Sequence, residues 1–534
     1  MSARRLLFAG GVLAVLAVAA GFRLPGLDHR PMHADEANQA VKTGILWETG
    51  TYHYDVADHH GPSLYWLTLP VLRLSGAADF AHSEEHAYRI VPVVFGLGVV
   101  ALVLLLADGL GRTAALAAGL LTAISPAMVY FSRYYIQEML LVFFTTGAIV
   151  AGWRYARSRR IGWAIALGAC FGMMHATKET WVLTAAAMAA GLAATAALAR
   201  WRDGETLRLG QFFRPLHLAA LLAAAAVAAT AFYSGFGRDW HGPWNSILAY
   251  FSYWRRGSQG GENGMHTHPW NYYFELLFAY RPARGFFWTE SLVAGLAAVG
   301  VISNLKFQIS PPQTEEGNQD PNPHLIRFLT VYTLVLTLLY TVIPYKTPWC
   351  SLSFLQGMIL LAGVGVGAIV HGLPGRPAKT VALLLLAAGA VHLGREAYAL
   401  NFRFAADYRN PYVYAHTPPD TVALAARLER LAQRAPEGHD LMIHVIADNA
   451  WPLPWYLRRF NSEHVGYWPR VAEWSKIIAQ VPPPAVVILT TDVQPEVDAG
   501  LRGEYNKQMI CGLRSGVLVQ VYVREDLWPL MVAE

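Results

Sequence analysis

Long apolar runs constrain this chain more than any other feature of its sequence. The clearest runs lie at 91–106, 113–129, 180–199, 216–233, 328–344 and 379–394. Each run is close to the ~20 residues that cross a bilayer as a helix. Of the 534 residues, 54% are hydrophobic and only 15% are charged, whereas soluble domains carry about 25% charged residues. The sequence therefore predicts a polytopic α-helical membrane protein.

The distribution of basic residues predicts how the spans are oriented. Hydropathy indicates roughly eleven spans, within a range of about eleven to thirteen. They lie near 6–22, 88–106, 113–131, 136–153, 161–176, 180–199, 215–234, 286–303, 327–344, 349–370 and 379–396. With a cytoplasmic N-terminus, most Lys and Arg fall in inner loops, as the positive-inside rule requires; the arginines of the long outer loop 235–285 are the exception. We therefore predict a multi-pass protein of the cell inner (plasma) membrane.

The first span leaves one choice open. Two arginines precede the run 6–22, and small residues lie toward its end, so this segment is either an uncleaved span, which we favour, or a signal peptide. Both interpretations place the first outer loop, 23–87, outside the cytoplasm. Within that loop, 61–76 is short for a span and is expected to be an interfacial helix. A polar stretch at 308–324 is expected to be a disordered cytoplasmic linker.

Hydropathy falls after residue 396, and the pattern becomes that of a soluble α/β domain. Short strands are expected at 441–447, 485–490 and 516–523. A helix is expected at 420–434. We therefore divide the chain into a transmembrane domain, 1–400, and a soluble extracytoplasmic α/β domain, 401–534. The segment WPLPWYLRR at 451–459 is either a Trp-rich packing corner or a surface that touches lipid or substrate.

Two adjacent carboxylates follow the first span. Asp35 and Glu36 occur in MHADEANQA, close to the predicted bilayer surface. Neighbouring residues on a helix point about 100° apart, so one carboxylate can face a site while the other is held by a partner. The pair is a candidate general base or metal ligand beside a lipid headgroup. The alternative is an ordinary acidic helix start.

Three short outer loops each carry one cation. These are Arg133 in FSRYYIQE, Lys178 in HATKET and Lys346 in YKTPW. A single cation in such a place usually anchors a helix end among the headgroups. Three of them on the same side as Asp35 predict an anion site, because Lys and Arg bind phosphate through charge-assisted hydrogen bonds. Tyr134 and Tyr345, each next to one of these cations, are candidate substrate contacts.

Three histidines are further candidate site residues, and the sequence has no motif for another cofactor or for nucleic acid. His266 and His268 in MHTHPW could bind a divalent metal with a carboxylate such as Glu262 or Asp35; solvated loop histidines are the alternative. His60 could orient a substrate oxygen or cap the interfacial helix. No other cofactor is indicated, because the cysteines are isolated and no Gly-rich phosphate loop occurs. Without a basic stripe interleaved with aromatics, nucleic acid is not an expected partner.

Three of these segments carry a resemblance to a known superfamily. HADEANQA (33–40), GPSLYW (61–66) and SRYYIQEMLL (132–141) together resemble the GT-C glycosyltransferases. More narrowly, they resemble the branch of protein O-mannosyltransferases and the aminoarabinose transferase of lipid A. Within that branch, the chain is most similar to the flippase-activity-associated group of archaeal-type N-glycosylation clusters. The resemblance spans roughly 1–400, and the C-terminal domain fits the architecture of the family without a matching motif.

The resemblance implies an inverting transfer of a sugar from a polyprenyl-phosphate donor to a protein, lipid or glycan acceptor at the outer leaflet. It implies Asp35 as the base or acceptor-orienting residue, with Glu36 in support. Arg133 and Lys178 would bind the donor phosphate, and His60 would replace a cation, because relatives often have KPP or HPP where this chain has HHGPS. One alternative is a lipid-linked oligosaccharide flippase without catalysis, which is less favoured because transporters place ionisable groups near the bilayer midplane. A second alternative is a non-catalytic partner that docks other glycosylation enzymes through its soluble tail.

Overall fold

A computed structural model of the chain describes residues 3–56, 60–202, 204, 214–259, 266–307 and 321–533. They form two compact units, which are described separately. Unit 1 comprises Met1–Leu27, Thr51–Leu67 and Arg89–Tyr412, and unit 2 comprises Asp28–Gly50, Thr68–Tyr88 and Val413–Glu534. Glu262 and residues 308–320 of the predicted linker lie outside the described residues.

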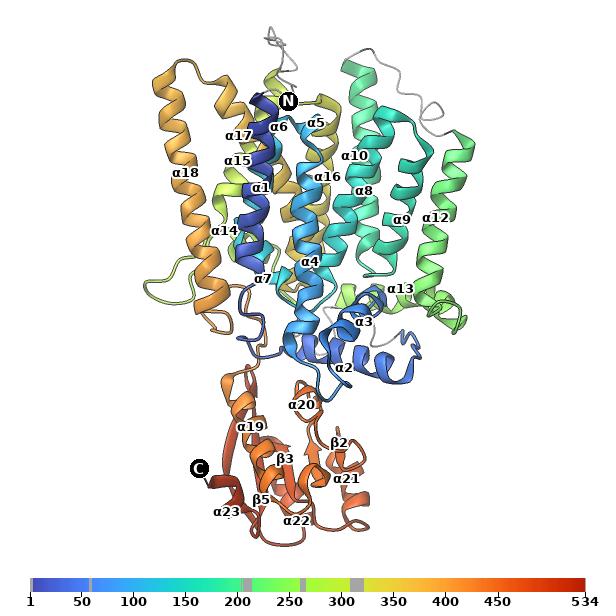
Figure 1. Cartoon of the computed structure of the whole chain (residues 1–534), viewed down its shortest axis with the longest axis vertical. Helices are drawn as coiled ribbons and strands as arrows, with labels where there is room; N and C mark the ends of the chain where they lie inside the picture. The colour runs from blue at the N-terminus through green and yellow to red at the C-terminus, as the bar shows by residue number, and fades with distance from the viewer. Residues whose placement is uncertain are drawn as a thin grey trace. The chain divides into compact units, whose positions relative to one another are not determined.

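Unit 1 is a bundle of helices (Figure 1), because a chain inside a bilayer must satisfy its backbone hydrogen bonds within each span. Its elements are α1 (Ala3–Arg23), α5 (Ala107–Leu110), α6 (Arg112–Ile124), α7 (Pro126–Ser132), α8 (Glu138–Ser158), α9 (Ile161–His175), α10 (Trp181–Arg202), α12 (Pro215–Tyr233), α13 (His241–Gln259), α14 (Tyr272–Phe278), α15 (Ser291–Phe307), α16 (Pro323–Val342), η2 (Pro348–Ser351), α17 (Leu352–Gly372), α18 (Arg376–Tyr398) and η3 (Ala399–Arg403). The helices α3 (Ser63–Ser75) and α4 (Glu85–Leu104) contribute residues to both units.

Eight helices in the described parts of the chain are long and apolar enough to cross a membrane. The fold is therefore a polytopic helical membrane protein, as predicted. The predicted span at 113–131 is instead the pair α6 and α7, bent by 60° and counted as a ninth span if the two cross together. The bend falls at Ser125, whose hydroxyl accepts a hydrogen bond from the backbone N–H of Met128. Pro126 follows it and has no N–H with which to continue α6.

Two other predicted spans are shorter than expected. The apolar helix at the predicted span 161–176 is Ile161–His175, and the one that overlaps the predicted span 286–303 is Ser291–Leu305. A helix of 15 residues, such as α9, rises about 22 Å, which is less than the ~30 Å of a hydrocarbon core. By length and composition the described residues support eight or nine spans, fewer than the expected number of about eleven to thirteen.

Glycines allow two of the helices in unit 1 to approach closely. Gly168 and Gly172 of α9 face α12, where an added Cβ would lie 2.0 Å from Leu221 O and 2.3 Å from Ala225 O respectively. Lipid tails are as apolar as leucine, so close packing of small residues, rather than water exclusion, holds such helix pairs together. Residues four apart share one face of a helix, which is why this spacing creates a contact surface.

The long loop predicted at 235–285 is partly helical, since it contains α13 and α14. Apolar side chains on α13 are exposed at Trp244, Ile247, Phe251 and Trp254. Their spacing of three and four residues places them on one face. A helix with an aromatic face of this kind is typical of the bilayer interface.

Unit 2 contains a five-stranded mixed sheet of order β2-β1-β3-β5-β4. Its elements are α2 (Ala34–Thr49), α19 (Pro419–Arg434), η4 (Gly438–Asp440), β1 (Ile443–Ile446), α20 (Leu453–Tyr456), β2 (Val465–Trp468), α21 (Val471–Ile478), β3 (Val486–Thr490), η5 (Thr491–Val493), α22 (Gln494–Gly500), β4 (Tyr505–Arg514), β5 (Val517–Arg524) and α23 (Trp528–Val532). β1 pairs in parallel with β2 and β3, and β5 pairs antiparallel with β3 and β4. The three predicted strands, β1, β3 and β5, and the predicted helix α19 are confirmed, whereas the edge strands β2 and β4 were not predicted.

Apolar clusters cover both faces of the sheet. Successive side chains of a strand point to opposite faces, so neighbouring residues belong to different clusters. Val445 of β1 packs in the same core cluster as Leu428 of α19. The next residue, Ile446, packs on the other side in a cluster with Trp474 of α21. This alternation explains why the inner strands read as nearly continuous apolar runs.

Trp455 joins two segments within unit 2. Its side chain is fully buried, and its Nε1 donates a hydrogen bond to Glu85 Oε1 at 3.1 Å. The indole contacts the rings of Phe80 and Tyr88 at 5.8 and 5.3 Å between ring centroids. Of the two interpretations of segment 451–459, the packing corner is therefore confirmed for Trp455.

We predict that Trp455→Ala destabilises unit 2 by about 3–5 kcal/mol, because it removes a buried aromatic ring and leaves a cavity. Thermal unfolding of the purified protein in detergent, followed by near-UV circular dichroism, measures the loss. The control is Trp201→Ala, since Trp201 is 85% exposed. Equal effects of the two substitutions would contradict the packing role of Trp455.

Candidate active site

One end of unit 1 brings together several of the predicted segments. It is the end of the bundle that carries α7 and α13, opposite the N-terminus of α1 (Figure 1). We call it the loop-rich end. It contains residues 51–56 and 60–67, 126–138, 175–181, 234–259 and 266–290, and 343–351.

The turn between α9 and α10 contacts the GPSLYW segment directly. The backbone N–H of Ser63 donates to Ala176 O at 2.9 Å, and the hydroxyls of Ser63 and Thr177 are 2.8 Å apart. At Gly61 an added Cβ would lie 2.3 Å from Ala176 O, so this approach requires a glycine. Two segments that are more than 100 residues apart in the sequence therefore form one structural element.

Lys178, in the same turn, forms a buried ion pair with Glu138 at the start of α8. Their exposed fractions are only 5% each. Burial alone would lower the pKa of Lys178, but the neighbouring Glu138 carboxylate offsets that effect and the pKa is raised above its ordinary value. Lys178 therefore stays protonated at neutral pH. Sequence reasoning missed Glu138 as a site residue, although a carboxylate at the mouth of an apolar span is itself a signal.

Glu179 provides a second buried carboxylate, and it holds His60. It accepts hydrogen bonds from Tyr54 Oη at 3.2 Å and from His60 Nδ1 at 2.9 Å. The ring of Tyr253 stacks on that of His60 with centroids 5.8 Å apart. The Glu179 side chain is 4% exposed, whereas the His60 side chain is 30% exposed. The imidazole is therefore oriented from behind by an acid and remains accessible.

Arg133 is used to hold the end of α1. Its Nη1 donates to the carbonyls of Arg23 at 3.0 Å and Pro25 at 2.6 Å, and its Nη2 donates to Gly26 O at 2.9 Å. The guanidinium also lies 4.6 Å from the ring centroid of Phe402. These bonds satisfy carbonyls that a helix end leaves unpaired. The role of Arg133 as a phosphate ligand stays a prediction.

Lys346 bonds to backbone carbonyls as well. Its Nζ donates to His268 O at 3.2 Å and to Ile343 O at 2.5 Å, and burial lowers its pKa. The backbone N–H of Lys346 donates to His266 O at 2.9 Å, so the YKTPW and MHTHPW segments pair. The rings of His266 and Tyr345 are 4.8 Å apart. The role of Lys346 toward phosphate also stays a prediction.

Tyr134 and the histidine pair are placed by packing. Tyr134 is fully buried and stacks on Trp349 at 6.0 Å, which joins the SRYY segment to YKTPW. His268 stacks on Tyr272 at 4.1 Å. In the described part of the chain, no group of three His, Cys, Asp or Glu side chains could hold a metal, and Glu262 lies outside that part. Metal binding by His266 and His268 stays a prediction without further support.

Asp35 and Glu36 begin α2 in unit 2, and their roles differ. Glu36 is fully buried; its Oε1 accepts from Arg30 Nη2 at 3.1 Å and its Oε2 accepts from the backbone N–H of His33 at 3.2 Å. The side chain of Asp35 is 49% exposed. One carboxylate is thus held by partners while the other is accessible. Because Asp35 belongs to unit 2 and the predicted phosphate ligands belong to unit 1, their meeting in one pocket stays a prediction.

His33 caps the helix that carries Asp35. Its Nδ1 accepts from the backbone N–H of Asp35 at 3.0 Å, and its Nε2 lies 2.6 Å from Tyr414 O. A ring that accepts at Nδ1 and donates at Nε2 is neutral. Burial lowers the pKa of His33, and burial also lowers the pKa of His416, whose ring lies 4.8 Å away.

Comparisons with known proteins found a family model that matches part of the chain and solved structures with a similar fold. Residues 63–236, which include the turn 175–181, match the family model described as dolichyl-phosphate-mannose-protein mannosyltransferase. No curated protein matches the chain in sequence. The structure of ArnT from Cupriavidus metallidurans bound to undecaprenyl phosphate is similar, with TM-score 0.62 and 16% identity over 97% of this chain and 98% of that chain. The archaeal oligosaccharyltransferase AglB from Archaeoglobus fulgidus, in complex with an inhibitory peptide and a dolichol-phosphate, has TM-score 0.58 and 12% identity over 92% and 70%. The chain is therefore ArnT-like in fold, and its matched segment is mannosyltransferase-like in sequence.

We predict that Lys178→Met destabilises the protein by about 3–5 kcal/mol, because it leaves the Glu138 carboxylate buried without its counter-charge. The double variant K178M/E138M should recover most of that stability, since removal of both charges of a buried pair is often nearly neutral. Thermal unfolding of the purified variants in detergent measures both effects. A double variant that is less stable than the single variant would contradict the ion-pair assignment.

We also predict that acidification loosens α2. A histidine whose folded pKa lies below its unfolded value of about 6.5 binds its proton more readily when unfolded, so its stabilisation is present above pH ~6.5 and is lost as pH falls below that value. Both His33 and His416 contribute to this loss, because burial lowers the pKa of each. Hydrogen exchange of the backbone amides of residues 34–49, measured above and below pH ~6.5, shows how much protection of α2 is lost.

The control for this effect is His33→Asn, because asparagine also caps helices but does not titrate. This variant should retain the protection of α2 at neutral pH and show a smaller loss on acidification. An unchanged pH dependence in the variant would remove His33 from the explanation.

Proposed function

We propose that this chain is a membrane glycosyltransferase that depends on a lipid-phosphate-linked sugar. The mannosyltransferase match over residues 63–236 carries the proposal. The fold supports it, because the similar ArnT and AglB structures hold undecaprenyl phosphate and a dolichol-phosphate respectively. A polyprenyl-phosphate sugar is therefore the donor class that fits best. Within the GT-C enzymes, the sequence segments 33–40, 61–66 and 132–141 favour the flippase-activity-associated group.

The proposed reaction is a single displacement at the anomeric carbon. The acceptor oxygen forms a bond to that carbon while the bond from the carbon to the phosphate oxygen breaks, and the electron pair leaves with the lipid phosphate. The configuration of the sugar is inverted. The acceptor proton passes to a carboxylate within hydrogen-bond reach, and fixed positive groups stabilise the charge that develops on the phosphate.

Asp35 fits the role of the base or acceptor-orienting group better than Glu36. The carboxylate of Glu36 is already bonded to Arg30 and to the cap of α2, and its side chain is fully buried. The side chain of Asp35 is about half exposed and is fixed at the first turn of α2 by the His33 cap. Glu36 therefore acts as a positioning residue that holds α2 in place.

His60 fits the role of donor-phosphate ligand best among the four predicted residues. Arg133, Lys178 and Lys346 are 6%, 5% and 1% exposed, and their described bonds go to backbone carbonyls or to Glu138. The His60 ring is accessible, and Glu179 hydrogen-bonds to its Nδ1. Tyr345, which is partly exposed, is the better candidate for a substrate contact than the buried Tyr134.

We propose that the loop-rich end faces away from the cytoplasm. The short turns and helix ends at the opposite side of unit 1 are rich in basic residues, as the positive-inside rule expects of a cytoplasmic side. These residues include Arg112, Arg154, Arg157, Arg159, Arg160, Arg200, Arg202, Arg327, Arg376 and Lys379. Polyprenyl-phosphate sugars would then be used at the outer leaflet of the plasma membrane.

We predict that Asp35→Asn lowers sugar transfer by at least about 100-fold, because general-base catalysis typically contributes 10²–10⁴-fold. The measurement is the release of a radiolabelled sugar from a polyprenyl-phosphate donor by the purified full-length protein. The variant should keep the thermal stability of the wild type, since the replaced side chain is isosteric and half exposed.

The matched control is Asp28→Asn, which neutralises an exposed carboxylate of the same loop and should leave the turnover unchanged. Wild-type turnover by the Asp35 variant would refute the assignment of Asp35. Absence of turnover in the wild type with every polyprenyl-phosphate sugar, together with lipid transport that the Asp35 variant retains, would favour the flippase function instead.

A further inference from the structure

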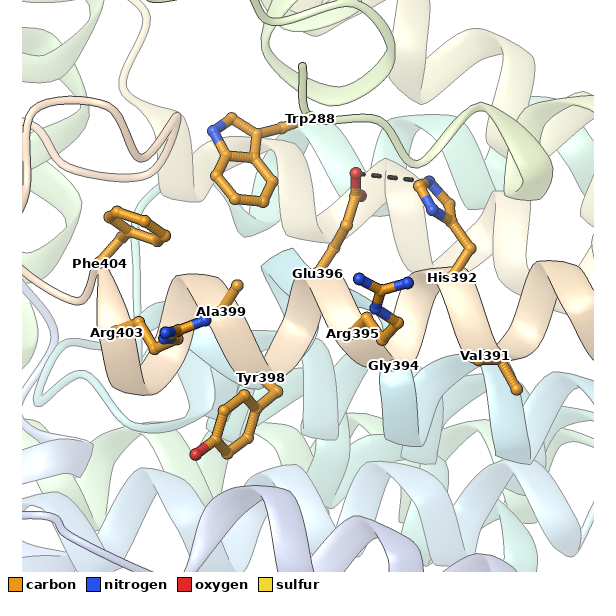
Figure 2. A pocket seen from close by; sticks show the side chains of 10 residues that line it. All are labelled: Trp288, Val391, His392, Gly394, Arg395, Glu396, Tyr398, Ala399, Arg403 and Phe404. Atoms are coloured by element: carbon orange, nitrogen blue, oxygen red, sulfur yellow. Dashed lines mark ion pairs between the residues drawn. The ribbon is translucent and has the colours of Figure 1, made fainter. Parts of the chain in front are cut away.

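A cavity of about 640 Å³ lies beside the last helix of unit 1 (Figure 2). We call it the α18 pocket. Its lining residues are Trp288, Val391, His392, Gly394, Arg395, Glu396, Tyr398, Ala399, Arg403 and Phe404. Only Trp288 lies within the ranges of the loop-rich end, and none of the predicted catalytic or phosphate-binding residues lines the pocket.

Two arginines on one stretch of helix dominate the charge of the α18 pocket. Arg395 and Arg403 are exposed, and neither has a hydrogen bond or ion pair with another side chain in the described part of the chain. Figure 2 shows both guanidinium groups along the same stretch of helix, between Trp288 and Tyr398. The two positive charges therefore remain available to a ligand from outside the chain.

The turn Ala399–Arg403 explains how the two arginines come to one side. Successive residues of an α-helix are rotated by about 100° around the helix axis, so two side chains eight residues apart would point roughly 80° away from each other. This turn is a π-helix, whose wider turn advances less per residue and so reduces that difference. Turns of this kind are frequent at functional sites.

The position of the pocket along the helix points to the headgroup region. The continuous helix Arg376–Arg403 has 28 residues and is about 42 Å long, so it exceeds the ~30 Å hydrocarbon core. Only 6% of its most apolar window is buried inside the protein, so most of this helix faces lipid. When the Arg376 end of this helix lies at one membrane surface, the pocket near its Arg403 end lies at the other surface, where phosphate headgroups are concentrated.

The pocket contains one acidic residue, Glu396. Its carboxylate accepts a hydrogen bond from the backbone N–H of Thr289 at 3.2 Å and pairs with His392 at 3.4 Å (Figure 2). The two arginines outnumber this carboxylate, so the lining keeps a positive charge. The aromatic rings of Trp288, Phe404 and Tyr398 supply the apolar walls that the upper part of an acyl chain can contact.

We propose that the α18 pocket binds the phosphate headgroup of an anionic bilayer lipid through Arg395 and Arg403. Guanidinium groups form paired, charge-assisted hydrogen bonds to phosphate oxygens. A basic residue near an anionic lipid surface contributes about fivefold in affinity, so two such residues contribute roughly 30-fold. The lipid would fasten the last helix to the bilayer beside the loop that contains Trp288.

The test is the binding of phosphatidylglycerol to the purified full-length protein in detergent, with phosphatidylcholine as the neutral reference lipid. The double variant R395Q/R403Q should lose phosphatidylglycerol binding by roughly 30-fold. The matched control is Arg376→Gln, which removes an exposed arginine at the other end of the same helix and should leave the affinity unchanged. The variant R395K/R403K should retain most of the binding, because its charges are kept.

Two outcomes would overturn the proposal. The first is an unchanged affinity of R395Q/R403Q for phosphatidylglycerol. The second is full displacement of the lipid by inorganic phosphate at the same phosphate concentration, since that would identify a site for free phosphate and not for a lipid headgroup. Binding is read here without turnover, so the result is independent of the proposed transferase activity.

Discussion

Every helix that crosses a bilayer ends with backbone groups that have no partner within the helix, and lipid offers them none. At the loop-rich end of unit 1, charged side chains satisfy several of these groups. Arg133 donates to Arg23 O, the last carbonyl of α1, at 3.0 Å, and Arg23 donates to Ala123 O at the end of α6 at 2.9 Å. Glu290, whose pKa is raised by burial, accepts from the backbone N–H of Ala127 at the start of α7 at 2.8 Å. The remaining geometry of this end depends on these bonds.

This constraint separates two classes of charged residue that look alike in a sequence. In the first class the charged group is buried and donates to backbone carbonyls near helix ends. Arg133 and Lys346 belong to this class, with exposed fractions of 6% and 1%. In the second class the polar group keeps an accessible face, as in Asp35 and His60, which is what the proposed substrate roles of these two residues require. For the proposed function, exposure therefore distinguishes the candidate residues better than charge alone.

The sequence predicted what depends on local composition, and it missed what depends on tertiary contact. Apolar runs located the helices of unit 1, and β1, β3 and β5 were found because inner strands are apolar. The edge strand β4 was missed because Lys507 and Gln508 interrupt its apolar pattern. The pairing of Lys178 with Glu138 joins residues 40 positions apart, and no local pattern contains such a partner. For the same reason Arg133 was interpreted as a free cation, although its acceptors are carbonyls of another helix.

The segment HHGPS holds a histidine in a fixed orientation, and this bears on the phosphate role proposed for His60. A lysine reaches a phosphate through four flexible methylene groups and loses rotational freedom when it binds. His60 is already oriented, because Glu179 bonds its Nδ1 and Tyr253 stacks on its ring. Gly61 fixes the backbone next to it against the turn at Ala176. A group that is fixed before the substrate arrives stabilises developing charge without reorganising. Under the proposed function, a histidine with a buried acid behind it would take the place of a flexible lysine at the donor phosphate.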